Sequence, residues 1–104
     1  MSSILVSVLY PSAPNATFDM EYYQTKHMPL VSAKWANFGL KQYFVADLRA
    51  APGPYSIQTT MVWEGTLENF QKAVAETGAE VMGDVANFSS EKPTLLTGTV
   101  LMSN

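Results

Sequence analysis

Cysteine is absent from this chain of 104 residues, and histidine occurs only once. Without cysteine the chain can form no disulfide bond and has no thiolate nucleophile, which is typical of a cytoplasmic protein, so we expect a cytoplasmic location. A metal site would have to combine the single histidine with carboxylates, and the acidic residues show no ligand spacing. We therefore expect neither a metal nor a cofactor.

Charged residues are scarce. They make up 14% of the chain, against about 25% in an average protein. The net charge of −3 argues against a nucleic-acid-binding module, which needs a basic patch. With so few charges to spread over its surface, a small protein is expected to cover part of its apolar surface with a partner.

Long hydrophobic runs are absent too. The apolar stretch over residues 4–10 follows no basic residues and is too short for a signal peptide. No other run approaches the length that crosses a bilayer. We expect no targeting segment and no membrane span.

Strand and helix patterns alternate along what we interpret as a single domain over residues 1–104. The β-branched run 4–10 stops at Pro11 and is typical of a strand. Thr17 is a candidate N-cap for a helix that begins at Phe18 and ends at the Met28–Pro29 step. A kinked continuation of this helix to Asn37 is the alternative.

The second half of the chain repeats this order without an internal linker. We predict strands at 40–48 and 55–64, a helix from Thr66 that Gly78 interrupts, a helical turn and loop over 79–88, and a last strand at 94–102. The order β-α-β-β-α-β predicts an α+β ferredoxin-like sandwich, in which two helices cover one face of a four-stranded antiparallel sheet.

Both faces of the predicted sheet are apolar. In the first strand, for example, Val6 and Val8 alternate with Leu5 and Leu9. Because a sheet with one face in water alternates between apolar and polar residues, and the helices cover only one face, the other face needs a partner. We expect a homodimer in which two sheets pack face to face.

The single histidine, His27, lies in the first predicted helix, two residues before Pro29. At 100° per residue the predicted buried stripe has Tyr23 and Asp19 near its centre and His27 at its margin. The other residues of the stripe are Phe18, Tyr22, Lys26 and Leu30, and those on the wet side are Glu21, Gln24 and Met28.

Tyr23 and His27 are four residues apart, so they can share a hydrogen bond. Pro29 removes a backbone donor and frees the Thr25 carbonyl. An imidazole at such a half-buried kink can act as an acid or a base near neutral pH.

Two other interpretations of His27 stay open on the residues alone. A single histidine at a helix margin is more often a satisfied structural residue than a catalyst. An axial histidine can also bind haem, although nothing specific in the sequence supports this. Phosphate-binding glycine loops and a G-x-S-x-G nucleophile are absent from the sequence.

Three segments of the chain strongly resemble the EthD family. They are "LYP" (9–11), "FDMEYYQTKHMPL" (18–30) and "VMGDVANF" (81–88). The family pattern matches without a gap at Phe18, Asp19, Tyr22, Tyr23, His27, Pro29 and Leu30, and its second motif matches at Asp84, Asn87 and Phe88. The similarity extends over essentially the whole chain.

This resemblance implies a dimeric α/β barrel with a pocket between the sheet and the helices of each subunit. EthD proteins are named for ethyl tert-butyl ether degradation and are linked to the oxidative breakdown of organic compounds, in some cases beside a cytochrome P450 system. Related barrels include cofactor-independent monooxygenases, lactone isomerases and polyketide-tailoring lyases or cyclases. The resemblance leaves the reaction and the substrate open.

The predicted site combines the resemblance with the helix geometry. We expect His27 to transfer a proton, Tyr23 to orient it or stabilise an enolate-like oxygen, and Asp19 to tune the pair. The aromatic residues expected to bind a small hydrophobic or aromatic compound are Tyr10, Tyr22, Tyr43, Trp63 and Phe88. The alternative is that these aromatics only fill the core.

Two functions follow from this site. The first is a cofactor-independent enzyme of catabolic or tailoring metabolism, with lyase, isomerase or monooxygenase-like chemistry. The second is a non-catalytic accessory protein that binds a small compound and supports an oxidoreductase of the P450 type.

Overall fold

Four antiparallel strands form one sheet in the order β2-β3-β1-β4 in the computed structural model, which describes residues 3–51 and 53–104. The strands are β1 (Ser3–Pro11), β2 (Leu40–Asp47), β3 (Tyr55–Glu64) and β4 (Thr94–Thr99). β1 pairs with β3 on one side and with β4 on the other, while β2 pairs with β3. Because β3 lies between β1 and β2, and β1 lies between β3 and β4, the helical connections that follow β1 and β3 each cross over one strand of the sheet.

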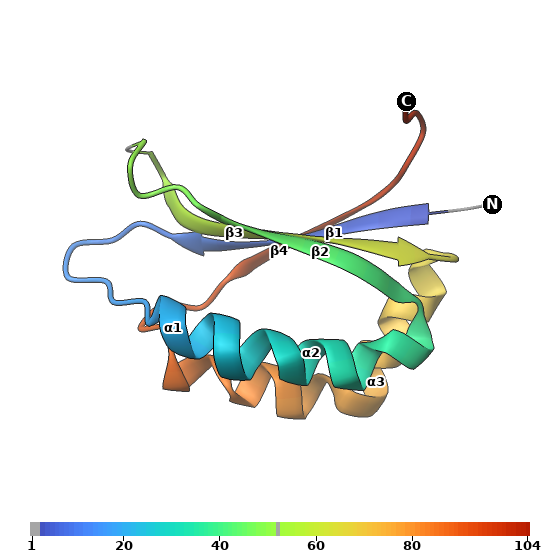
Figure 1. The fold of residues 1–104 in the computed structure, drawn as a ribbon, viewed down its shortest axis with the longest axis horizontal. Coiled ribbons are helices and arrows are strands. Elements are labelled where there is room, and N and C mark those ends of the chain that lie inside the picture. Colours follow the sequence, from blue (N-terminus) through green and yellow to red (C-terminus); the bar gives the residue numbers. More distant parts are fainter. Residues whose placement is uncertain (1–2, 52) are drawn as a thin grey trace.

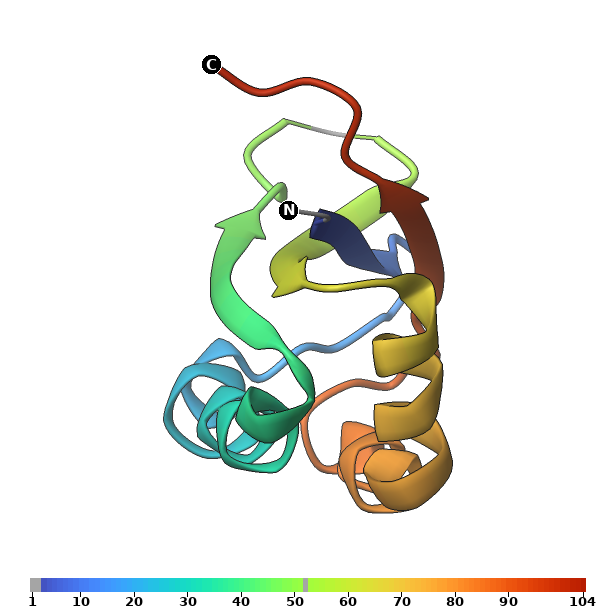
Figure 2. The same ribbon diagram turned by 90° about the vertical axis from the view of Figure 1, so that its right-hand side faces the viewer.

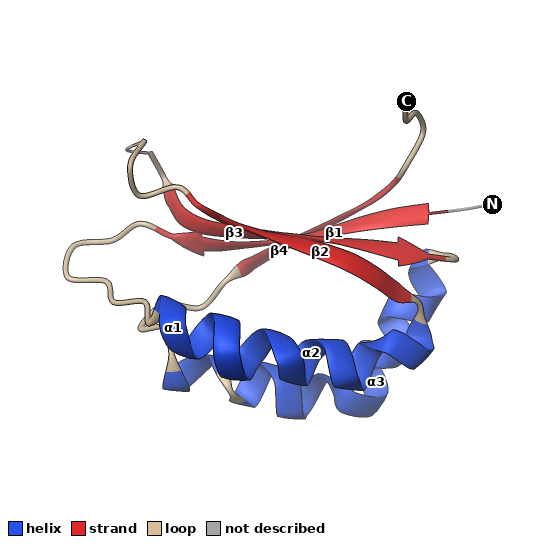
Figure 3. Cartoon of the chain, in the orientation of Figure 1, coloured by secondary structure: helices blue, strands red, loops and turns tan. Residues whose placement is uncertain are grey.

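Helical segments cover one face of this sheet, and the opposite face carries none (Figures 1 and 2). Between β1 and β2 lie α1 (Met20–Tyr22), η1 (Tyr23–His27), α2 (Met28–Trp35) and η2 (Ala36–Phe38), and between β3 and β4 lie α3 (Leu67–Gly83) and η3 (Val85–Asn87). Figure 3 shows the resulting two layers, one of strands and one of helices. The predicted ferredoxin-like α+β fold is confirmed.

The core lies between the sheet and the helices. Alternate residues of β1 and β3 point into it, so that Val6, Ile57 and Trp63 are fully buried. Trp35 from α2 and Phe70 from α3 pack against Trp63, with ring centroids 5.6 and 5.3 Å away. Apolar burial of this kind provides the main stabilisation of a domain this small.

The first helical region is continuous through Pro29 and includes a π-helical turn, η1. The backbone N–H of Met28 donates to the carbonyl of Tyr23, five residues earlier. A π-helical turn contains one extra residue, so every later side chain is displaced around the helix. For this reason Met28 is buried, which corrects its predicted place on the wet side, and Lys26 is exposed although the pattern placed it on the buried stripe.

The start of this helix also differs from the prediction. Asp19, and not Thr17, is the N-cap, because its carboxylate accepts a hydrogen bond from the backbone N–H of Tyr22 at 3.0 Å. Thr17 lies in the preceding segment, where its backbone N–H bonds the hydroxyl of Ser90. Pro29 does not end the helix: it occupies the first turn of α2, where a missing N–H is tolerated.

The second helix is longer than predicted. α3 runs without a break through Gly78, which is buried inside it, and ends at Gly83. A single glycine costs a helix about 1 kcal/mol relative to alanine but does not interrupt it. The predicted interruption at Gly78 is therefore wrong, and much of the segment 79–88 belongs to α3 and η3.

The last strand is shorter than predicted and ends at Thr99. Its final link to the sheet is a hydrogen bond of 2.9 Å from the N–H of Val100 to the carbonyl of Ser3. After it the chain leaves the sheet on the side opposite the helices (Figure 1). None of the helices in the described part of the chain has the length and apolar character to cross a membrane.

Candidate functional site

His27 lies at the end of η1 with its side chain almost fully buried. Its Nδ1 atom is 2.9 Å from a carboxylate oxygen of Asp84, which follows α3. The pair therefore joins the first helical region to the end of the second. No other hydrogen-bond partner of the His27 ring is found within residues 3–51 and 53–104.

The Asp84 carboxylate is held by two further donors. The Tyr22 hydroxyl donates to its other oxygen at 2.7 Å, and the side-chain amide of Asn87 donates to the same oxygen at 2.9 Å. Burial alone would raise the pKa of Asp84, but the hydrogen bonds from Asn87, Tyr22 and His27 hold it below its usual value. Asp84 is thus an anion over the physiological range, with the oxygen that faces His27 fixed in place.

The burial of His27 lowers the pKa of its imidazole, and the hydrogen bond and charge of Asp84 oppose this shift without reversing it. At neutral pH the ring is therefore uncharged. A neutral imidazole must donate from Nδ1 to reach the Asp84 carboxylate, so Nε2 keeps its lone pair. This is the arrangement that a general base requires.

Aromatic rings enclose the imidazole. The Tyr23 ring stacks on it at 5.2 Å and 17°, and Phe88 contacts it at 4.5 Å. The predicted hydrogen bond between Tyr23 and His27 is not formed, because the Tyr23 hydroxyl instead bonds that of Thr59 on β3. Burial raises the pKa of Tyr23, which keeps this hydroxyl protonated.

A small cavity of about 30 Å³ lies between the sheet and the helices. Its walls are largely apolar, and its hydroxyl groups come from Tyr10, Tyr23 and Thr59. Trp35, Met61 and Leu95 are among the remaining lining residues, whereas His27 is not. Tyr23 connects the two features, because its ring contacts the imidazole and its side chain lines the cavity.

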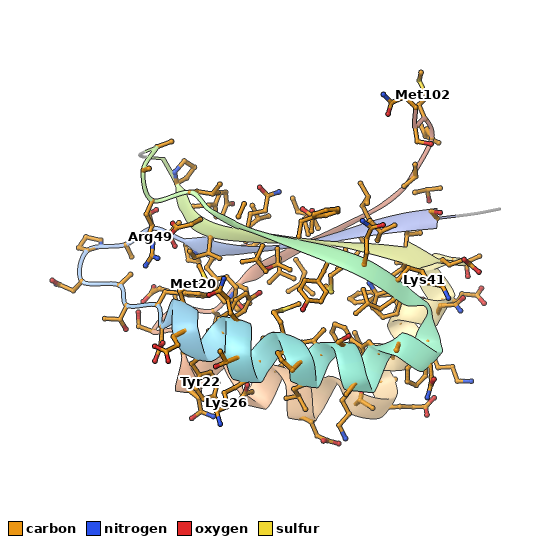
Figure 4. All side chains as sticks on the ribbon, in the orientation of Figure 1. Met20, Tyr22, Lys26, Lys41, Arg49 and Met102 are labelled. Carbon is orange, nitrogen blue, oxygen red and sulfur yellow. The ribbon has the colours of Figure 1, made fainter. Side chains whose placement is uncertain are left out.

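The structure brings together only some of the predicted site residues. Tyr10 lies in the same aromatic cluster as Tyr23 and Phe88, at 5.9 and 5.8 Å. Asp19 makes no contact with His27 that would tune it, since its carboxylate caps the helix. Tyr22 contacts the site through Asp84, and Figure 4 shows its side chain beside that of Lys26, on the helix side that points away from the sheet.

The other predicted ligand-binding aromatics lie outside the cavity. Tyr43 on β2 is 37% exposed, and Trp63 is a fully buried core residue. Neither lines the cavity between sheet and helices. In the described residues no three or more His, Asp or Glu side chains gather as a metal site would require.

Two residues of the site were missed by sequence reasoning. Asp84 had a signal, since it belongs to the segment "VMGDVANF", but it was given no role because 57 positions separate it from His27. Thr59 carried no signal beyond its place in a strand. Both contacts depend on tertiary packing, which spacing along one helix does not reveal.

Comparison with known proteins finds solved structures with a similar fold. No family profile matches the sequence, and no curated protein shows significant similarity to it. An EthD-like protein from Ralstonia eutropha shares 30% identity and a TM-score of 0.86, over 100% of this chain and 96% of the other.

Two more distant structures share the fold alone. SnoaB from Streptomyces nogalater, described as a cofactor-independent oxygenase, has 13% identity and a TM-score of 0.64 over 100% of both chains. A dimeric ferredoxin-like protein from an uncultured marine organism has 12% identity and a TM-score of 0.67, again over 100% of both chains.

Proposed function

The chain belongs to the EthD-like protein family, and on that premise we propose that it binds a small hydrophobic organic compound and acts on it by cofactor-independent acid–base chemistry. The observation that carries this proposal is the buried His27–Asp84 pair, which is joined through Tyr23 to an apolar cavity. The metabolic setting is catabolic or tailoring metabolism, linked to oxidative degradation.

In this proposal His27 is the general base. Nε2 accepts a proton from a carbon or oxygen of the bound compound, and the resulting imidazolium is stabilised by the Asp84 carboxylate at Nδ1. The electron pair left on the compound becomes an enolate or phenolate. Tyr23, which stays protonated, donates a hydrogen bond to the developing oxyanion.

The ligand class follows from the cavity. Its walls are mostly apolar and its polar groups are neutral hydroxyls, which suits an uncharged compound with one or two oxygens. At about 30 Å³ the space holds little more than a water molecule, so the side chains around it must move to admit a larger compound. Met61 and Met82 are flexible lining residues that can allow this.

The test begins with a panel of small aromatic alcohols and ketones, including phenol and 1-naphthol. Binding is followed by tryptophan fluorescence, because Trp35 lines the cavity and Trp63 is fully buried. Turnover of the bound compounds in air is then measured by mass spectrometry for the wild type, His27→Ala and the exposed control Lys26→Ala. Loss of turnover only in His27→Ala, with an unchanged circular dichroism spectrum, supports the proposal; equal turnover in all three excludes His27 as the base.

A second candidate function is a non-catalytic accessory protein that binds a similar compound for an oxidoreductase of the P450 type. One observation favours it: His27 does not line the cavity, and its contact with Asp84 joins two helices as a structural residue would. This function predicts binding without turnover and unchanged binding in His27→Gln.

In either case the proposed unit is a homodimer. The sheet face opposite the helices, here called the open face, exposes Leu5, Phe44 and Leu96 by 39%, 58% and 57%. Contact between water and this much apolar surface is unfavourable, and a second copy packed against the open face would shield the apolar surface from water. Phe44→Lys should therefore produce a monomer in sedimentation velocity, and an unchanged dimer would exclude this interface.

A further inference from the structure

The tail that follows β4, residues 100–104, carries the two most exposed large hydrophobic side chains in the described part of the chain. Leu101 is 90% exposed and Met102 is 91% exposed. In Figures 1 and 2 the tail stands off the sheet on the side of the open face, and Figure 4 shows Met102 far from the helices. The exposure of two adjacent apolar side chains to water is unfavourable, so covering them would stabilise the protein.

Charge is missing from the tail and from the three middle rows of the open face, whereas the row where the tail begins pairs Ser3 with the exposed Glu64. Residues 93–104 contain no acidic or basic side chain. The strand register places Phe44, Thr60, Ser7 and Leu96 in one row across the open face. The neighbouring rows on this face hold Gln42, Val62, Leu5 and Gly98 on one side and Ala46, Gln58, Leu9 and Thr94 on the other, again without charge. A surface without charge can meet an identical copy without repulsion, which a two-fold contact requires.

The sheet topology gives the tail a direction. β2 and β4 are the two edge strands, and the three antiparallel pairings make them run in opposite directions. A two-fold axis parallel to the strands, placed above the open face, sets β4 of one copy beside β2 of the other in antiparallel orientation. Residues that extend β4 then reach the partner, and the two exposed sheet edges are both covered.

We propose that residues 100–104 form an arm that packs on the open face of a second copy of the chain, while the partner's arm packs on this copy in return. The inference rests on the homodimer proposed above and adds the segment that locks it. Leu101 and Met102 are the anchors, and the open face near the partner's β2 edge receives them.

The test compares dimer dissociation constants, measured by sedimentation velocity on the full chain. The double variant Leu101→Glu and Met102→Glu should weaken the dimer at least about tenfold, because both apolar anchors are lost from each copy. The matched control is the double variant Ser103→Glu and Asn104→Glu, which places the same two charges on polar positions of the tail and should change the constant by less than about threefold.

A second measurement uses the absence of cysteine. Met102→Cys gives a single labelling position for an environment-sensitive dye, and Glu76→Cys, on the exposed side of α3, gives the control. The arm predicts a blue shift of the dye at position 102 as the protein is concentrated through its dissociation constant, and no shift at position 76.

The outcomes separate the arm from the dimer itself. If Phe44→Lys produces a monomer while the double arm variant stays as tight as the wild type, the arm is refuted and the sheet-face dimer stands. If the wild type is monomeric at every concentration and the dye at position 102 never shifts, both are refuted. Weakening by the arm variant, together with the shift at position 102 alone, supports the arm.

Discussion

Asp84 offers a sharp test of the site, because its carboxylate accepts hydrogen bonds from His27, Tyr22 and Asn87. Asp84→Ala removes both acceptor oxygens and with them all three hydrogen bonds. Asp84→Asn keeps the shape and one acceptor oxygen, and its amide can face Nδ1 of His27 only if the imidazole moves its proton to Nε2. The two variants therefore separate the packing of this residue from its charge.

The cost of Asp84→Ala comes mainly from His27. Its side chain is 5% exposed, so an Nδ1–H without a partner incurs a desolvation penalty, and a hydrogen bond to a charged acceptor is lost with it. Together these amount to about 2–3 kcal/mol. In a chain of this size that lowers Tm by about 10–20 °C. Asp84→Asn should cost about 1 kcal/mol, because the other tautomer of His27 restores one hydrogen bond.

Urea unfolding at fixed protein concentration, followed by circular dichroism, measures both differences. The tautomer is observed directly by ¹⁵N NMR, in which the only histidine of a tag-free chain gives one unambiguous ring signal. We expect the proton on Nδ1 in the wild type and on Nε2 in Asp84→Asn, with turnover lost in the latter. An Asp84→Ala variant within about 0.5 kcal/mol of the wild type would show that Asp84 does not hold His27 in solution.

Three further predictions concern pH and the backbone. Burial lowers the folded-state pKa of His27 below its ordinary value of 6.5, so between these two pKa values the unfolded chain binds more protons than the folded one. Stability in a urea titration should therefore be full above pH 6.5, decline as the pH falls from 6.5 toward the folded-state pKa, and level off below it, whereas His27→Gln should be flat in this range. Gly39→Ala should destabilise the fold by about 1–3 kcal/mol in the same assay, because Gly39 has φ +125° and a Cβ there would lie 2.5 Å from the backbone oxygen of Glu64. Gly78→Ala should instead stabilise the fold by about 0.5–1 kcal/mol, because alanine has the higher helix propensity. The tightest contact of the new Cβ, at 3.1 Å, is with the half-exposed side chain of Val74, which can rotate away. A loss of stability would show that the Val74 side chain cannot rotate.

Local patterns were sufficient to predict the fold. The alternation in residues 4–10 and 55–64 predicts the two central strands and the residues that share each face, because one register places every second residue on the same side of the sheet. Gly39 marks the end of the first helical region because its backbone conformation, with φ +125°, is one that glycine tolerates. Gly78 gave a misleading signal, since a glycine that faces a helix core looks the same in sequence as one that ends a helix.

The site was less predictable, because its decisive contacts join residues far apart in the chain. His27 and Tyr23 were identified from one helix, but the partner of each lies elsewhere: Asp84 for the imidazole and Thr59 for the phenol. The spacing of residues 18–30 gives no reason to prefer the distant Asp84 over Asp19 as the partner of His27. The Asp19 carboxylate instead accepts a hydrogen bond from the backbone N–H of Tyr22 at the start of the helix. Only the tertiary fold brings the Asp84 carboxylate within reach of His27.

The π-helical turn explains why the single histidine stands two residues before a proline. In a regular helix Tyr23, His27 and Val31 would face the core and Met28 would point away from it, but the extra residue of η1 lets His27 and Met28 both turn inward. Met28 then lines the cavity while His27 faces Asp84. Pro29 favours this irregularity, since its missing N–H removes a bond that would hold the turn in the regular register. The histidine and the proline thus act as one feature, in which a local defect of the helix brings an apolar wall and an oriented imidazole to the same buried region.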